Sequence, residues 1–108
     1  EGTRFDLKWQ LVWEIINQGA AGRDLSWIDL SHATLRAANL KGAVLFGANL
    51  RTTDLRGANL SGTDLGGADL DGADMSDADL RGAYVIDKQL MYVKSLKGAL
   101  MPDGTRYE

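Results

Sequence analysis

The sequence predicts a solenoid, a chain that coils on itself in repeated turns, and three observations predict it. Between Ile28 and Asp87 a large apolar residue returns at every fifth position. A small residue, most often Ala, lies two positions before it, and Gly usually lies two positions after it. Asp or Asn occupies most of the positions directly before it. The repeating unit is therefore Ala-(Asp/Asn)-Leu-x-Gly.

A period of five residues fits neither a helix nor a one-sided strand. On an α-helix, five residues advance by about 140° around the axis, so the large residues would not share a face. On a strand, an odd spacing sends every second one to the opposite face. The backbone must therefore turn once per repeat to give them one interior, and Gly tolerates such a turn. The large residues are Leu30, Leu35, Leu40, Leu45, Leu50, Leu55, Leu60, Leu65, Leu70, Met75, Leu80 and Val85.

Such repeats are expected to be stable only as an array. Ordering the backbone of five residues costs on the order of 5–10 kcal/mol, whereas burying one Leu contributes roughly 1.5–3 kcal/mol. The remaining stabilisation must come from hydrogen bonds and dispersion contacts between stacked coils.

This unit resembles the A(D/N)LxX motif of the pentapeptide repeat family, and the resemblance covers more than half of the chain in an unbroken register. Members of that family fold as an all-β solenoid, a right-handed quadrilateral β-helix in which four repeats make a square coil of about twenty residues. The resemblance implies four inward columns of side chains, with the small residues also pointing inward. The columns are Leu45, Leu65 and Val85; Leu30, Leu50 and Leu70; Leu35, Leu55 and Met75; and Leu40, Leu60 and Leu80.

Residues 3–19 are expected to form an N-terminal capping helix. Thr3 followed by Asp6 matches a helix start, and Gly19 favours its end. Apolar residues gather on one side, and we expect that side to cover the open end of the first coil. They are Phe5, Trp9, Val12, Trp13 and Ile16, flanked by Leu11 and Ile15. The alternative is an amphipathic helix for a partner or a membrane surface, and its few basic residues argue against a membrane.

The repeat coils are expected to span residues 23–86. Their register begins at Leu25, and Trp27 stands where Gly usually follows. We expect this first coil to be transitional and in contact with the helix. His32 holds the same corner position one repeat later. Because the chain has one His and no Cys, we interpret His32 as a solvated corner residue rather than a metal ligand or catalytic group.

The register breaks after Val85. Residues 87–94 are expected to form a short helix with Asp87 as its N-cap, and the residues it buries are Leu90, Met91 and Val93. Residues 95–108 are expected to resume the repeat one residue out of phase, with Leu96 and Met101 inward and Ala99 in the small position. A turn at 102–104 then stops further pairing. Segments 8–14 and 96–105 resemble the ends of cyanobacterial members of the family.

Composition indicates a single domain over residues 1–108. The formal net charge of -3 is mild, and the absence of Cys excludes disulfides and thiolate metal sites. No apolar run approaches the length of a membrane span. We expect no cofactor, no metal site and no membrane association. We also expect a cytoplasmic location, with the thylakoid lumen or periplasm as the alternative if a signal peptide has been removed.

The acidic residues do not indicate catalysis. Most follow the five-residue spacing of the repeat, which places them on outward positions of successive faces. Catalytic carboxylates need unequal environments and a concave pocket, whereas a filled coil offers outer walls. No nucleophile and base, phosphate-binding loop or metal-ligand spacing is present. We therefore expect no enzymatic activity.

Charge varies along the repeats. Basic residues, Arg36, Lys41, Arg51 and Arg56, come first, and Asp residues dominate from Asp64 to Asp79. Either this surface is solvated and joined by ion pairs between coils, or it is a bipolar docking surface. On one face Val44 and Phe46 are followed two coils later by Tyr84 and Ile86, which could anchor a partner or lie under the terminal helices. The candidate interaction residues are Arg36, Phe46, Arg51, Arg56, Asp69, Asp71, Asp74 and Tyr84.

Two function classes remain. The first is a non-catalytic scaffold for protein-protein interaction, acting as a monomer or weak dimer on a protein partner that the sequence does not identify. The alternative follows from the resemblance, because some pentapeptide repeat proteins mimic DNA and inhibit a DNA topoisomerase such as gyrase. Direct nucleic-acid binding is not expected, because the basic residues form no continuous stripe.

Overall fold

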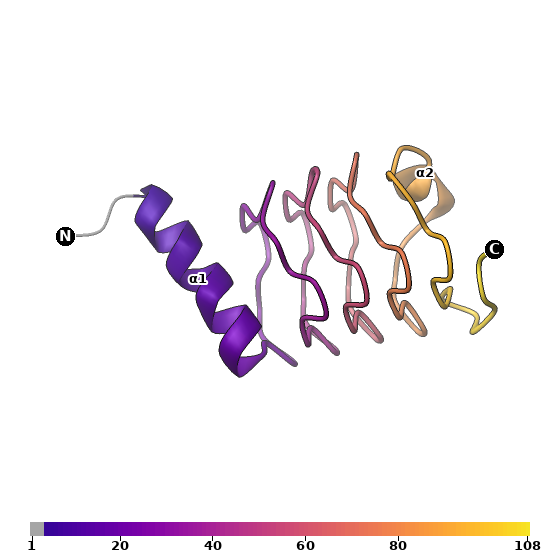
Figure 1. Cartoon of the computed structure of the whole chain (residues 1–108), viewed down its shortest axis with the longest axis horizontal. Coiled ribbons are helices and arrows are strands. Elements are labelled where there is room, and N and C mark those ends of the chain that lie inside the picture. The colour runs from indigo at the N-terminus through magenta and orange to yellow at the C-terminus, as the bar shows by residue number, and fades with distance from the viewer. Residues whose placement is uncertain (1–3) are drawn as a thin grey trace.

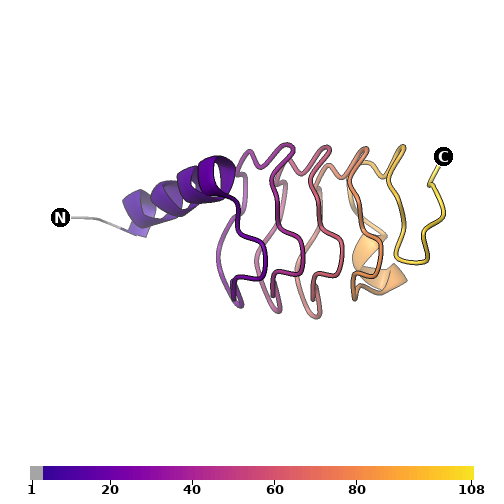
Figure 2. The same cartoon turned by 90° about the horizontal axis from the view of Figure 1, so that it is seen from below.

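The chain winds into a stack of coils that follows one long helix. The structure, a computed structural model, describes residues 4–108 and the side chains of residues 7–108. It contains α1 (Arg4–Gln18) and α2 (Asp87–Leu90). The coils run along the long axis of a molecule of 45 × 24 × 20 Å (Figures 1 and 2). The expected helix start at Thr3 and Asp6 and the predicted role of Phe5 lie outside what is described.

Isolated parallel β-bridges join each coil to the next. Asp24 pairs with Val44 and Val44 with Asp64, so the same position returns after twenty residues. Within residues 4–108 no continuous strand forms, because a turn interrupts the backbone within a few residues of each bridge. The predicted β class is therefore present as single bridges, and not as strands.

The large apolar side chains fill the interior, as predicted. Every one from Leu30 to Leu80 is at most 1% exposed, and the Ala or Thr two positions before is buried as well. Thr53 remains satisfied there because its hydroxyl donates to the carbonyl of Leu30 at 2.9 Å. Val85, at the end of its column, is only partly buried. It lies two residues before α2 begins, where the regular coil stops.

The residues directly before and after each large apolar residue point outward and define four faces. Face 1 flanks Leu25, Leu45, Leu65 and Val85; face 2 flanks Leu30, Leu50 and Leu70; face 3 flanks Leu35, Leu55 and Met75; and face 4 flanks Leu40, Leu60 and Leu80. Corners between faces are β-turns, in which the carbonyl of the large residue accepts the N–H three residues later, as from Ala33 to Leu30 at 3.1 Å.

The third residue of each turn has a positive φ, which explains the recurrent Gly. Gly42, for example, has φ 68°. Five other residues adopt the same conformation at a steric cost of roughly 1–2 kcal/mol each. They are Trp27, His32, Ala37, Thr52 and Asp77, with φ between 53° and 62°.

The Asp or Asn that precedes most of the large residues has a structural role that the repeat pattern alone did not predict. Its Oδ1 accepts the backbone N–H two residues later, at 3.0 Å from Ser26 to Asp24 and at 3.2 Å from Lys41 to Asn39. Asp and Asn share this acceptor geometry, so the repeat uses either. The bond secures the backbone just before each corner.

α1 covers the open end of the first coil with a side that overlaps the predicted one at Val12 and at the residues predicted to flank it. Ile15 is fully buried, and Leu11 and Val12 pack against the core. Trp13 and Ile16 remain 57% and 45% exposed, which contradicts the predicted buried face. The rotation of α1 is set by its short connection to the coil. Gly19 still donates to the Ile15 carbonyl at 3.0 Å, while the next residue already donates to the carbonyl of Asn39 at 2.8 Å.

α2 differs from its prediction at both ends. Ile86, not Asp87, is the N-cap, and the Gln89 side chain accepts the Ile86 N–H at 3.0 Å. Gln89 also donates to the carbonyls of Leu65 and Ala68, at 2.6 and 3.0 Å. α2 ends at Leu90 instead of residue 94. By residue 92 the backbone is again bonded to the preceding coil, since the Tyr92 carbonyl accepts the N–H of Gly72.

The last coil is displaced by one residue. Asp74 pairs with Ser95 and Asp79 with Leu100, an offset of 21 residues. Leu96 and Ala99 are buried. The chain then turns back, with an antiparallel bridge between Leu100 and Arg106. This return covers the C-terminal edge with paired backbone.

Replacing Leu55 tests the interior. We expect Leu55→Ala to lower the free energy of unfolding by about 2–5 kcal/mol, because it leaves a cavity. Leu55→Asp should abolish cooperative melting, because an unpaired charge would be buried. Arg56→Ser, at the next outward position, is the control and should retain a cooperative transition. Circular dichroism melts measure all three, and a cooperative Leu55→Asp protein would contradict this placement.

The pH dependence of an Asp24 variant tests the role of the Asp that precedes the large residue of a repeat. Hydrogen bonds from the Ser26 hydroxyl and N–H hold the pKa of Asp24 below its ordinary range. A folded pKa below the unfolded one stabilises the fold above about pH 4, and this stabilisation is lost as the pH falls through the folded pKa. Asp24→Asn keeps the acceptor for the N–H, so its melting temperature should fall less than the wild type's between pH 5 and 3. Equal pH dependence would contradict this role.

Candidate functional site

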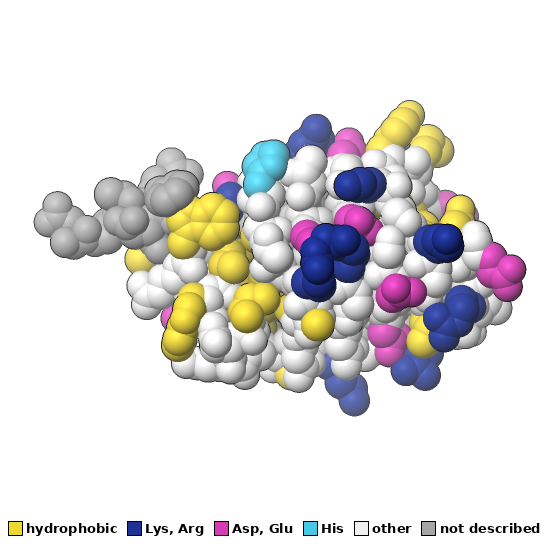
Figure 3. Space-filling view, in the orientation of Figure 1, with side chains coloured by type: hydrophobic (Ala, Val, Ile, Leu, Met, Phe, Trp, Pro, Cys, Tyr) yellow, Lys and Arg dark blue, Asp and Glu magenta, His cyan; other side chains and the backbone are white. Residues whose placement is uncertain are grey.

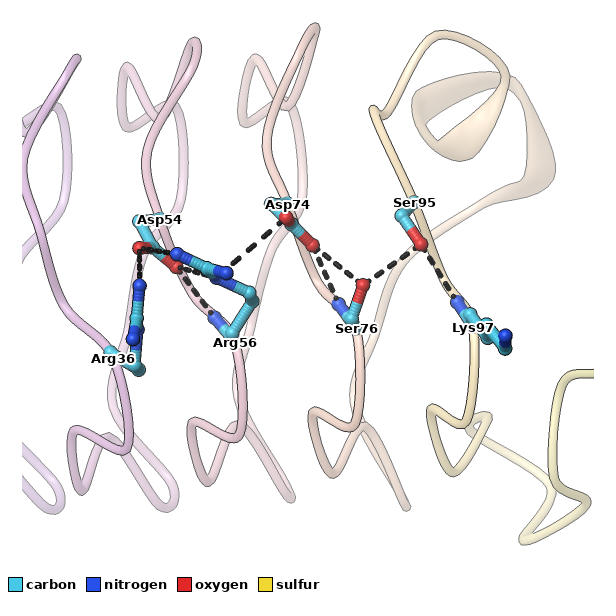
Figure 4. A network of polar contacts seen from close by, with 7 residues as sticks. All are labelled: Arg36, Asp54, Arg56, Asp74, Ser76, Ser95 and Lys97. Carbon is cyan, nitrogen blue, oxygen red and sulfur yellow. Dashed lines mark hydrogen bonds and ion pairs between the residues drawn. The ribbon is translucent and has the colours of Figure 1, made fainter.

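The predicted basic and acidic residues of face 3 form one network across successive coils (Figure 4). Asp54 accepts from Arg36 at 3.2 Å and from Arg56 at 2.8 Å. Arg56 also approaches Asp74 at 3.7 Å. The row continues through Ser76, whose hydroxyl donates to the Asp74 carboxylate at 2.7 Å and to the Ser95 hydroxyl at 2.8 Å.

Face 2 carries a second group of predicted residues. Arg51 lies 3.2 Å from Asp69 and 3.3 Å from Asp71, both on the next coil. The hydrogen bond and charge of Asp69 raise the pKa of Arg51, with a further contribution from Asp71. Arg51 therefore bridges two carboxylates that would otherwise repel each other.

These pairs support the first interpretation of the charge pattern, a solvated surface joined by ion pairs between coils. The basic side chains of one coil contact the acidic side chains of the next, so the basic and acidic segments of the sequence form ion pairs with each other. Figure 3 shows Lys and Arg next to Asp and Glu side chains over the coils, with hydrophobic side chains over α1. Because Arg36, Arg51 and Arg56 are 44–57% exposed, each pair contributes only about 0–1 kcal/mol.

Phe46 and Tyr84 lie apart from this network, on face 1. They are 43% and 64% exposed, so neither lies under a terminal helix. Phe46 meets Trp27, with ring centroids 5.4 Å apart and planes at 85°. Trp27 is 72% exposed, and its ring lies over Gly47 of the next coil. Trp27 is not among the interaction residues predicted from the sequence. Its bulk at a Gly position was the available signal.

The described residues contain no group of three or more His, Cys, Asp or Glu that could hold a metal ion. His32 is exposed at its corner, and its Nδ1 contacts the Thr52 hydroxyl. A hollow of about 400 Å³ near the C-terminus is lined by side chains that include Asp77, Lys97 and Arg106. Arg106 is engaged there with the Gly98 carbonyl at 2.7 Å. Neither described helix is long and apolar enough to cross a membrane.

Comparison with known proteins agrees with this architecture. The sequence profile of the family described as Pentapeptide repeats matches residues 24–62 and 48–85, in 8 copies. A crystal structure of a pentapeptide repeat protein from Nostoc PCC 7120 has 39% sequence identity and a TM-score of 0.66, over 85% of this chain and 74% of that one. No curated protein matches the sequence.

Two other solved structures are similar over part of their length. HetL, a pentapeptide repeat protein involved in heterocyst differentiation regulation in the cyanobacterium Nostoc sp. strain PCC 7120, has 35% identity and a TM-score of 0.44, over 78% of this chain and 43% of that one. A pentapeptide repeat protein from the thylakoid lumen of Arabidopsis thaliana has 33% identity and a TM-score of 0.36, over 76% of this chain and 60% of that one. The chain thus spans less than two thirds of either protein.

A double-mutant cycle on Arg51 and Asp69 tests whether the charge network is structural. We expect Arg51→Ala and Asp69→Ala to be coupled by about 0.2–1 kcal/mol in the free energy of unfolding, because the pair is exposed. The cycle of Arg51 with Asp64, with which Arg51 forms no described ion pair, is the control. Urea denaturation measures both cycles, and equal coupling in the two would contradict the observed pairing.

Proposed function

The chain belongs to the pentapeptide repeat family, and from this premise we propose that it is a non-catalytic scaffold for protein-protein interaction. The observation that carries the proposal is the separation of buried apolar side chains from exposed outward ones. Leu and Ala side chains occupy the interior, so only outward and corner side chains are left to meet another molecule. Of these, Phe46 and Tyr84 are large, apolar and exposed, as protein-binding anchors commonly are.

We also propose that the coils have the right-handed quadrilateral form implied by the family resemblance. Two observations support a four-sided coil. Bridges recur after twenty residues, and within that interval the chain passes four corners with backbone turns. Each side then contributes one large and one small side chain to the interior.

A protein partner fits the charges better than a nucleic acid does. Arg36, Arg51 and Arg56 each contact a carboxylate, so a phosphate backbone would have to compete with these pairs. The same pairing weighs against DNA mimicry, because arginines lie among the carboxylates that would have to imitate phosphates. We therefore propose no role at a topoisomerase.

Affinity capture from a lysate of the source organism tests the scaffold function. Immobilised wild-type protein should retain a specific protein, and either Arg51→Glu or Phe46→Ala should reduce its recovery several-fold, since interface energy concentrates in few residues. Lys41→Ala, on face 4, is the control and should retain the wild-type level. Mass spectrometry measures recovery. Finding no protein enriched over the control resin would contradict the proposal.

A further inference from the structure

We propose that face 1 binds a polypeptide segment that carries a Lys or Arg side chain next to apolar side chains. The inference rests on the proposed scaffold function and assigns it one face and one class of partner. Three independent features of face 1 carry it: its apolar composition, aromatic residues that the fold does not require, and carboxylates that form no ion pair in the described part of the chain.

Face 1 is the apolar face of the coils. Phe46, Tyr84 and Ile86 are 43%, 64% and 51% exposed on it, and Trp27 adds a 72% exposed ring at its corner. The outward residues of face 1 are Asp24, Ser26, Val44, Phe46, Asp64, Gly66, Tyr84 and Ile86. None is Lys or Arg, whereas faces 2, 3 and 4 each present at least one Lys or Arg. An exposed apolar row of this kind is typical of an interaction site.

The aromatic residues are not explained by the fold. Trp27 occupies a corner with φ 62°, where most coils have Gly and a bulky residue is strained. The position of Phe46 is filled by Ser31, Ser61 or Ser76 on other faces, and these serve the repeat equally well. Both rings remain exposed, so each buries little apolar surface. This burial offsets little of the backbone strain at Trp27.

Two glycines shape the surface around the rings. A Cβ at Gly47 would clash with the ring of Trp27, and a Cβ at Gly66 would lie 3.0 Å from the ring of Phe46. The ring of Trp27 therefore packs on the backbone of Gly47, and the ring of Phe46 packs on the backbone of Gly66. The pair is held at right angles, with aromatic surface left open to solvent. Such faces attract cations by their negative quadrupole.

The carboxylates of face 1 differ from those of the other faces in their ion pairing. Neither Asp24 nor Asp64 forms an ion pair with any residue in the described part of the chain. Two basic residues adjoin face 1 in sequence, Arg23 before Asp24 and Lys88 after Ile86, and in the described part of the chain neither forms an ion pair with Asp24 or Asp64. Arg23 pairs with Glu14 at 3.2 Å, and Lys88 lines a hollow with residues of face 2. Every outward carboxylate of faces 2, 3 and 4 that flanks a large residue does contact a cation. These are Asp29, Asp54, Asp69, Asp71, Asp74 and Asp79.

Face 1 therefore offers aromatic surface and uncompensated negative charge together. A Lys or Arg of a partner would satisfy both, through the carboxylate of Asp64 and the ring of Phe46, while apolar neighbours would cover Tyr84 and Ile86. A second copy fits less well. A two-fold contact through face 1 would bring the same unpaired carboxylates of both copies into one interface.

Selection from a phage-displayed library of random peptides tests the proposal. The variants are chosen from residues that the repeat already uses: Phe46→Ser, Trp27→Gly and Asp64→Asn. Asp64→Asn removes the charge but keeps the acceptor for the Gly66 N–H, as Asn39 does for Lys41. Trp27→Gly should relieve backbone strain. Melting temperatures confirm that each variant is folded. Lys41→Ala and Arg81→Ala serve as controls on face 4, and Arg51→Ala reports on face 2.

We expect enriched peptides to place Lys or Arg beside aliphatic or aromatic residues. With the most enriched peptide as a labelled probe, fluorescence anisotropy should show binding weakened about tenfold or more by Phe46→Ser or Trp27→Gly. Asp64→Asn should weaken it about two- to fivefold at low salt and less at high salt. The two controls should bind as the wild type does.

Three outcomes would overturn the assignment to face 1. They are enrichment of acidic peptides, binding that depends on Arg51 but not on Phe46, and no enrichment at all. A dimer in sedimentation velocity that Phe46→Ser dissolves would also overturn it, because a second copy would then occupy the face. Capture of a protein from the lysate, unaffected by the face 1 variants, would leave the scaffold function standing while removing this inference.

Discussion

The whole structure depends on one constraint, the return of each coil onto the previous one after twenty residues. Backbone hydrogen bonds hold this register, as between the N–H of Leu50 and the carbonyl of Asp69 at 2.8 Å. The five-residue repeat follows from it. Each side of the coil supplies one Leu to the interior, one small residue beside it and a turn at the corner. No single repeat could be stable, since its apolar side is covered only by its neighbours.

The same constraint restricts which residues are available to bind another molecule. Interior positions are filled, and most corners require a residue that tolerates a positive φ. Outward positions are free to vary, and the chain uses them in two ways. On faces 2 and 3, arginines and aspartates of successive coils neutralise each other. On face 1, aromatic and aliphatic side chains lie among carboxylates that form no described ion pair, and this contrast marks face 1 as a binding surface for a cationic, apolar segment.

Periodicity was sufficient to predict the interior, because the same coil geometry recurs at every repeat and buries every residue from Leu30 to Leu80 in the five-residue series. It was not sufficient for α1. A helix with apolar residues on most sides has several faces that could be buried, and the short connection at Gly19 selects Ile15 and leaves Trp13 exposed. The ends of α2 were also missed, since Gln89 and the returning backbone define them through contacts with distant residues.

For the candidate site, the sequence identified the charged residues but not their pairing. Arg51 meets Asp69 and Asp71 only because eighteen to twenty residues of chain bring them to adjacent coils. Trp27 was missed as a surface residue because its strain and its contact with Phe46 appear only in three dimensions.

The twenty-residue register is measured most directly by NMR scalar couplings across hydrogen bonds in the folded protein. We expect a coupling between the amide nitrogen of Leu50 and the carbonyl carbon of Asp69, and likewise between the amide nitrogen of Leu60 and the carbonyl carbon of Asp79. Couplings that join these amides to carbonyls at another separation, or none in a well-folded protein, would contradict it.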